Sequence, residues 1–130
     1  MIVDASAILA ILLDEPESRL FGDLLIESDD RHVISPINYL EAAIKLDSPQ
    51  YRAKSQDLDP LLKVHDVSIT LITPEQAVIA REAYARFGKG NHPARLNLGD
   101  CFAYALSKAR SEPLLFKGDD FRQTDVEAAL

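Results

Sequence analysis

Apolar residues in this chain form short runs that are separated by longer segments with helical periodicity. The runs fall at 2–3, 32–35, 67–72 and 112–117, and a weaker fifth run lies at 124–130. Continuous apolar runs are typical of parallel strands buried on both faces. The segments between them predict helices over 5–13, 16–27, 36–46, 59–65, 74–87 and 98–110.

Local signals support several of these helix starts. Ser6 is a candidate N-cap of the first helix, and Ser35 precedes a proline at the first position of the third. Thr73 opens a "TPEQ" capping box, and Asn97 precedes the last helix. The alternation of strands and helices predicts one domain over residues 1–130, a three-layer α/β/α sandwich around a mainly parallel sheet of four to five strands.

Composition indicates the cellular location of the protein but not its function. Cys101 is the only cysteine, which excludes an intrachain disulfide and indicates a reducing, cytoplasmic location. No apolar run approaches the roughly 20 residues that span a bilayer, and an early aspartate argues against a secretory signal. We therefore expect a cytoplasmic protein with no membrane association.

Acidic residues follow the predicted strands, at the sheet edge where open parallel sheets bind ligands. Asp4 follows the first strand, and Asp119 and Asp120 follow the fourth. Glu41 lies in the second turn of the helix after the second strand, and Asp100 in the first turn of the last helix. Taken singly, Asp4 has the alternative role of a helix cap, Asp100 that of a first-turn acid and the Asp119–Asp120 pair that of a surface turn.

Glu41 is harder to explain as a surface residue. Ile37, Leu40 and Ile44 are expected to form the core-facing stripe of its helix, and Glu41 lies only about 40° from Ile37. A carboxylate on such a face needs a partner.

Clustered carboxylates repel one another unless a cation is present, and an all-oxygen donor set suits Mg²⁺ or Mn²⁺. The three histidines lack metal-ligand spacing, which argues against zinc. A carboxylate-held Mg²⁺ most often serves phosphoryl chemistry. The usual phosphate-binding glycine loops and the nucleophile elbow are absent.

Four segments in order, "IVDASA", "NYLEAAI", "HPARLNLGDCFAYALSKA" and "PLLFKGDDFRQTDV", resemble those of PIN-domain ribonucleases, and most closely VapC-type toxins of bacterial toxin–antitoxin pairs. The resemblance implies an endoribonuclease that uses Mg²⁺ or Mn²⁺ and a metal-activated water. It also implies inhibition by a cognate antitoxin protein and assembly as a homodimer.

The resemblance carries the family's acidic residues onto Asp4, Glu41 and Asp100, with Asp119 or Asp120 as the fourth. Asp4 and Asp100 are the expected metal ligands, and Ser6 is either a hydrogen-bonding support or a helix cap. Many PIN domains have T-x-D where this chain has Lys117-Gly118-Asp119, so the role of that hydroxyl is not carried over.

The charge distribution favours a local anion-binding face on an acidic body. The net charge is −7, yet residues 81–122 hold eight basic against five acidic residues. The expected RNA contacts come from this segment: Arg81, Arg86, Lys89, Arg95, Lys117 and Arg122.

Other functions fit the sequence less well. A haloacid-dehalogenase-like phosphatase would need a second aspartate where Ser6 stands, and a receiver domain would need acidic residues at other strand ends. A catalytically idle PIN-fold module that binds an antitoxin or RNA remains the alternative to an enzyme.

Overall fold

The computed structural model describes all 130 residues, and its centre is a parallel sheet with the strand order β3-β2-β1-β4. The strands are β1 (Ile2–Val3), β2 (His32–Ile34), β3 (Val67–Ile69) and β4 (Leu114–Leu115). The predicted parallel sheet is confirmed. The expected fifth strand is reduced to one parallel bridge, between Leu114 of the two-residue strand β4 and Ala128.

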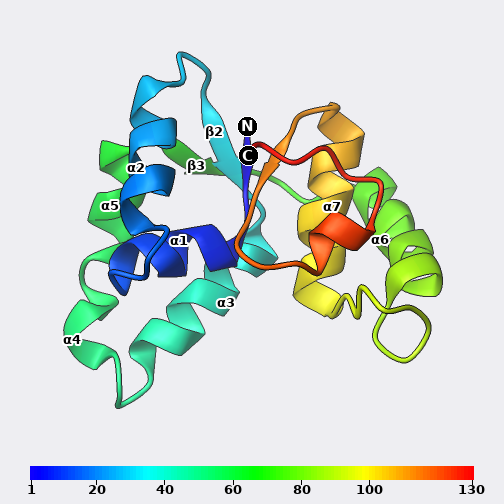
Figure 1. Cartoon of the computed structure of the whole chain (residues 1–130), viewed down its shortest axis with the longest axis horizontal. Coiled ribbons are helices and arrows are strands. Elements are labelled where there is room, and N and C mark those ends of the chain that lie inside the picture. Colours follow the sequence, from blue (N-terminus) through cyan, green and yellow to red (C-terminus); the bar gives the residue numbers. More distant parts are fainter.

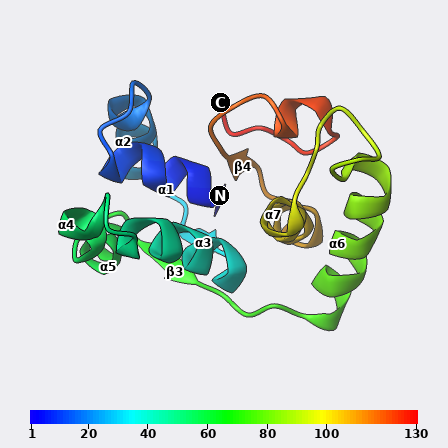
Figure 2. The ribbon, with the colours of Figure 1, turned by 90° about the horizontal axis from the view of Figure 1, so that it is seen from below.

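Helices cover both faces of the sheet. One group holds α1 (Ala5–Leu12), α2 (Ser18–Glu27), α3 (Pro36–Asp47), α4 (Arg52–Ser55) and α5 (Leu58–Val64). The other holds α6 (Pro74–Phe87) and α7 (Leu98–Arg110), followed by a 3₁₀ turn, η1 (Phe121–Gln123). Figure 1 shows the two groups on either side of the strands, and Figure 2 shows the same separation from below. This is the predicted three-layer sandwich.

The two faces of the sheet bury separate cores because neighbouring residues of a strand point to opposite sides. Val3 packs with Ile8 and Leu46 in the core under α1–α5, whereas Ile2 packs with Leu106 in the core under α6 and α7. The short strand β1 is therefore fixed from both sides, together with the residue that follows it.

Helix starts agree with the sequence at three places and differ at two. Thr73 and Asn97 cap α6 and α7 through their side chains, as predicted. Ser35 occupies the predicted N-cap position of α3, but its buried hydroxyl makes no capping hydrogen bond. The N-cap of α1 is Asp4 instead of Ser6, because its carboxylate accepts the backbone N–H of Ser6. Helix α2 begins at Ser18, two residues after Pro16, because residues 15–17 form a separate turn.

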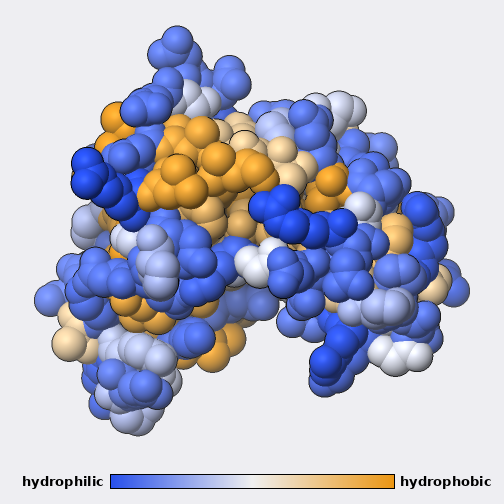
Figure 3. All heavy atoms as spheres, viewed as in Figure 1, coloured by the Kyte–Doolittle hydropathy of each residue, from blue (hydrophilic) through white to orange (hydrophobic).

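The surface is mostly hydrophilic, with an apolar area over α2 and toward the chain ends (Figure 3). No helix of the structure has both the length and the hydropathy needed to cross a membrane.

Candidate active site

Asp4 is held rigidly at the end of β1. Its side chain is 4% exposed, and its backbone N–H donates to the Leu115 carbonyl of β4 at 2.9 Å. Its Oδ2 accepts the Ser6 backbone N–H at 3.0 Å and the Ser6 hydroxyl at 2.5 Å. Burial raises the pKa of Asp4, although the hydrogen bonds from Ser6 and Ala5 oppose that rise. The carboxylate is thus fixed in place but lacks a neutralising charge.

Ser6 connects Asp4 to the loop after β4. The backbone N–H of Lys117 donates to the Ser6 hydroxyl oxygen at 3.0 Å, and that hydroxyl donates to Asp4. The side chain of Lys117 pairs with Glu15 and with Glu17. These contacts match the hydrogen-bonding support expected of Ser6. The other role considered for Ser6, the N-cap of α1, is taken by Asp4.

Asn38 joins three elements at the site, and the sequence analysis missed it. The side chain is fully buried, and its Nδ2 donates to Glu41 Oε1 at 2.9 Å, to the Gly99 carbonyl at 3.0 Å and, more weakly, to Asp4 Oδ1 at 3.4 Å. Its Oδ1 has no hydrogen-bond partner although it is buried. A signal for Asn38 is present in the sequence. Asn38 lies three residues before Glu41, and side chains three residues apart share a helix face and can form a hydrogen bond.

The predicted core stripe of α3 is wrong. Leu40 and Ile44 are 52% and 63% exposed, whereas the buried row of α3 is Asn38, Ala42 and Leu46. In this orientation the Asn38 Nδ2 donates inside the site, and Ala42 is small enough to pack in the core under α1. Glu41 lies next to that row and is half-buried at the start of α7.

Glu41 packs directly against Gly99. A Cβ atom at position 99 would overlap the Glu41 carboxyl group. Glycine therefore lets α7 approach the carboxylate in its present position, and no signal within the helix sequence itself indicates this.

Asp100 has two roles in the structure. Its Oδ2 accepts the Asn97 backbone N–H at 3.0 Å, and Asn97 Oδ1 accepts the Asp100 N–H at 2.9 Å, which completes a capping box. The first-turn role considered from sequence is thus real, and it also aims Asp100 toward the other acids. Burial raises the pKa of Asp100 to about 6, against the Asn97 hydrogen bond, with further rises from Asp4 and Asp120.

Asp119 and Asp120 follow β4 in an exposed turn at Gly118, whose φ of +98° favours glycine. Asp120 lines an open pocket of about 360 Å³ with Lys89, Arg95, Asn97 and Asp100, whereas Asp119 does not line it. Of the two acids, the geometry places Asp120 beside the site.

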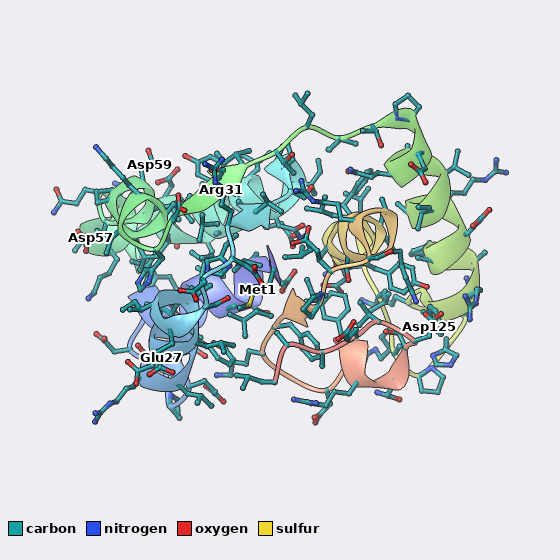
Figure 4. The ribbon with its side chains drawn as sticks, turned by 90° about the horizontal axis from the view of Figure 1, so that it is seen from above. Met1, Glu27, Arg31, Asp57, Asp59 and Asp125 are labelled. Atoms are coloured by element: carbon teal, nitrogen blue, oxygen red, sulfur yellow. The ribbon has the colours of Figure 1, made fainter.

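The six basic residues expected to contact RNA divide into two groups. Lys117 is paired as described, Arg86 pairs with Asp125, and Arg122 donates to the Leu130 carbonyl. Figure 4 shows Asp125 near α6, where it also accepts from Tyr104 of α7. The other group, Arg81, Lys89 and Arg95, has no acidic partner within ion-pair distance.

The acidic residues of the site have no positive charge close enough to balance them. Burial and the nearby charges of Asp4 and Asp100 raise the pKa of Glu41 to about 7. No basic side chain forms an ion pair with Asp4, Glu41, Asp100 or Asp120. No three of the acids lie close enough to ligate one ion. Mg²⁺ is commonly held by one or two carboxylates with water completing its shell, so the donor set fits a hard divalent cation.

The raised pKa of Glu41 predicts how the free energy of unfolding of the metal-free protein depends on pH. Because the folded-state pKa of Glu41 is raised above its ordinary 4.5, folding favours the protonated acid, and stability is lost as pH rises from about 5 through 7. Replacing Glu41 with glutamine should remove this loss and stabilise the chain at pH 7.5 by about 1–2 kcal/mol, after allowance for solvent screening.

Urea unfolding in EDTA at pH 5 and pH 7.5 measures this effect. Taking the difference between the wild-type and Glu41→Gln curves cancels the titrating groups that do not interact with Glu41, His65 among them. A difference that does not grow with pH would contradict the prediction.

Comparisons with known proteins agree with this geometry. A model of the PIN domain family matches residues 1–127. VapC ribonuclease Mb0625 of Mycobacterium bovis and ribonuclease VapC28 of Mycobacterium tuberculosis are each 48% identical over 131 residues, covering 100% of this chain and 98% of the relative. Ribonuclease VapC of Mycolicibacterium smegmatis is 44% identical over 128 residues, 98% of each chain.

A solved structure shows the same fold. The crystal structure of Mycobacterium tuberculosis VapC20, described as a sarcin-ricin loop cleaving toxin, superposes with a TM-score of 0.77. It covers 96% of this chain and 95% of that one at 14% identity, which supports the fold alone. With the family model matching almost the whole length and full-length relatives at 48% identity, the chain belongs to the PIN-domain family and, within it, to the VapC proteins.

Proposed function

We propose that this protein is a divalent-metal-dependent endoribonuclease and the toxin of a toxin–antitoxin pair. The observation that carries the proposal is the buried Asp4 carboxylate, joined through Asn38 to Glu41 beside Asp100, with no basic side chain to neutralise the group. Relatives named VapC ribonuclease at 48% identity support the same activity.

In this proposal Asp4 and Asp100 hold Mg²⁺ or Mn²⁺, and Glu41 and Asp120 complete the site through water molecules of the ion's shell. The bound ion supplies an activated water at neutral pH and offsets charge on the phosphate. Asn38 and Ser6 fix the orientations of Glu41 and Asp4. Lys89 and Arg95 bind the RNA backbone at the open side.

Cleavage of a labelled single-stranded RNA in Mg²⁺, Mn²⁺ or EDTA tests the proposal. We expect cleavage with either ion and none in EDTA, with activity restored when the ion is added back. Cleavage that persists in EDTA would contradict metal dependence. If calorimetry detects no binding of either ion, the idle binding module becomes the better description.

The unpaired cations next to Asp100 predict a salt-dependent contribution to RNA binding. Replacing Lys89 or Arg95 with alanine should weaken binding and lower the slope of log K against log salt by about 0.7 for each residue. Arg110→Ala is the matched control, because Arg110 pairs with Glu112 at the far end of α7. Fluorescence anisotropy in EDTA measures binding without cleavage, and equal slopes for all three variants would contradict the assignment.

Two protein partners complete the proposal, a cognate antitoxin and a second copy of the chain. Large apolar side chains are exposed on α3, at Leu40 and Ile44, and at the end of β3, at Ile69 and Leu71. Such exposure favours a protein interface on this part of the surface. Light scattering on the purified chain measures whether it is a dimer, and a monomer at all concentrations would contradict that part.

A further inference from the structure

A second pocket lies between α6 and α7, next to the acidic site. It has a volume of about 500 Å³, in the range of small-ligand sites. Its apolar wall includes Tyr84 of α6 and Leu98 and Phe102 of α7. Two of these side chains are left in solvent, since Leu98 is 66% exposed and Tyr84 is 44% exposed. The fold leaves this apolar hollow open to solvent.

The α6–α7 pocket is continuous with the acidic site. Lys89 and Asn97 line both the α6–α7 pocket and the pocket that contains Asp100 and Asp120. Asn97 caps α7, Asp100 follows in its first turn, and Leu98 lies between them in the sequence. A phosphate-linked polymer with one phosphate beside Asp100 therefore passes Lys89, and its next unit lies over Leu98.

The charged residues that line the α6–α7 pocket indicate which class of ligand fits it. Arg81 and Lys89 line it, and neither forms an ion pair, on a chain whose net charge is −7. Aromatic and apolar walls next to backbone-binding cations are the combination that binds single-stranded nucleic acid. An apolar side chain of a protein partner would cover the same wall but leave both cations without a counterpart.

We propose, on the basis of the proposed nuclease function, that the α6–α7 pocket binds one base of the RNA, on the nucleotide adjacent to the cleaved phosphate. The base packs on Leu98, Tyr84 and Phe102, and Arg81 and Lys89 bind its flanking phosphates. The pocket is then a determinant of which RNA segments are cleaved, because it contacts the base where the acidic site contacts only the backbone.

A titration that involves no cleavage tests the pocket directly. The full chain in EDTA is titrated with each of the four nucleoside 5′-monophosphates and, as the base-free control, with ribose 5-phosphate, while backbone amides are followed by NMR. We expect Leu98 and Phe102 to shift with at least one nucleotide and not with ribose 5-phosphate. Equal shifts with ribose 5-phosphate, or no shift with any nucleotide, would overturn the proposal even if the nuclease activity is confirmed.

A pocket-filling variant gives the second test. Ala77 is exposed and lines the pocket, so Ala77→Trp should occupy it, and Ala53→Trp on the distant helix α4 is the matched control. We expect the KM for RNA to rise about tenfold in Ala77→Trp, which corresponds to about 1.4 kcal/mol, with kcat within about twofold of wild type. Ala53→Trp should leave both unchanged.

Two outcomes of this second test would overturn the proposal. One is an identical KM in the two variants while melting temperatures show that both fold. The other is weaker binding of a protein partner by Ala77→Trp with RNA cleavage unchanged, which would assign the pocket to a protein side chain. A chain that shows no cleavage at all contradicts the proposed function instead, and the nucleotide titration then decides on the pocket alone.

Discussion

Replacing Asp4 with asparagine is expected to abolish metal-dependent RNA cleavage while the fold is kept. Asparagine has nearly the same shape and retains an oxygen that can accept from Ser6, but it removes the charge that holds the cation. Loss of a ligand that contributes several kcal/mol of charge stabilisation lowers kcat/KM by roughly 10²–10⁴-fold. Quantified cleavage of a labelled RNA in saturating Mg²⁺ measures this loss.

Stability should respond very differently from activity. The Asp4 carboxylate is buried without a counter-charge, so its neutral replacement avoids a desolvation cost. This gain offsets the weaker hydrogen bonds from Ser6 and Ala5 and the loss of the 3.4 Å contact with Asn38. We expect the free energy of unfolding in EDTA to change by about 1 kcal/mol or less.

Asp57→Asn is the control for this experiment. Asp57 is an exposed acid before α5 whose side chain forms no cap hydrogen bond, and it should retain full activity. Wild-type activity in Asp4→Asn would exclude Asp4 from the site. Unfolding of that variant would instead show that the carboxylate is needed for the structure.

The parts of this site that could be predicted are those fixed by local rules. Asp4 follows directly from the end of a buried strand, and Asp100 follows from its place three residues after the Asn97 cap. Both positions are set by residues within one turn, so the sequence alone predicts their side chains at the sheet edge.

What could not be predicted depends on contacts between distant segments. Asn38 reaches the Gly99 carbonyl across 61 residues of sequence, from the face of α3 that is buried. The periodicity of Ile37, Leu40 and Ile44 indicated the wrong face because hydrophobicity alone does not record a buried amide with three acceptors. The exposed apolar row of α3 is free to pack against a partner protein. The hydrophobic pattern of one chain does not distinguish such an interface from a core-facing row.

Replacing Gly99 with alanine is expected to damage the site without touching any acidic residue. The new methyl group overlaps the Glu41 carboxylate, so that side chain must move out and give up its 2.9 Å hydrogen bond from Asn38. Displacement of a catalytic group by about 1 Å lowers activity by about 10²-fold. Loss of that hydrogen bond should also reduce the free energy of unfolding by about 1 kcal/mol, and the better helix propensity of alanine offsets part of this loss. Cleavage rates and urea unfolding measure the two effects.

Gly22→Ala is the matched control because Gly22 also lies in a helix, α2. There the added Cβ has its nearest neighbour at 4.0 Å, His65 Cε1, so we expect full activity and a gain of about 0.5–1 kcal/mol.

A double-mutant cycle separates the overlap from any general effect on α7. With Glu41 shortened to alanine the space opposite Gly99 is open, so adding Gly99→Ala should then cost nothing and gain up to about 1 kcal/mol. The coupling free energy between positions 41 and 99 is expected to be about 1 kcal/mol, within the range seen for contacting residues. Additive effects would mean that Glu41 and Gly99 are not in contact, and that the close approach of α7 does not position the carboxylate.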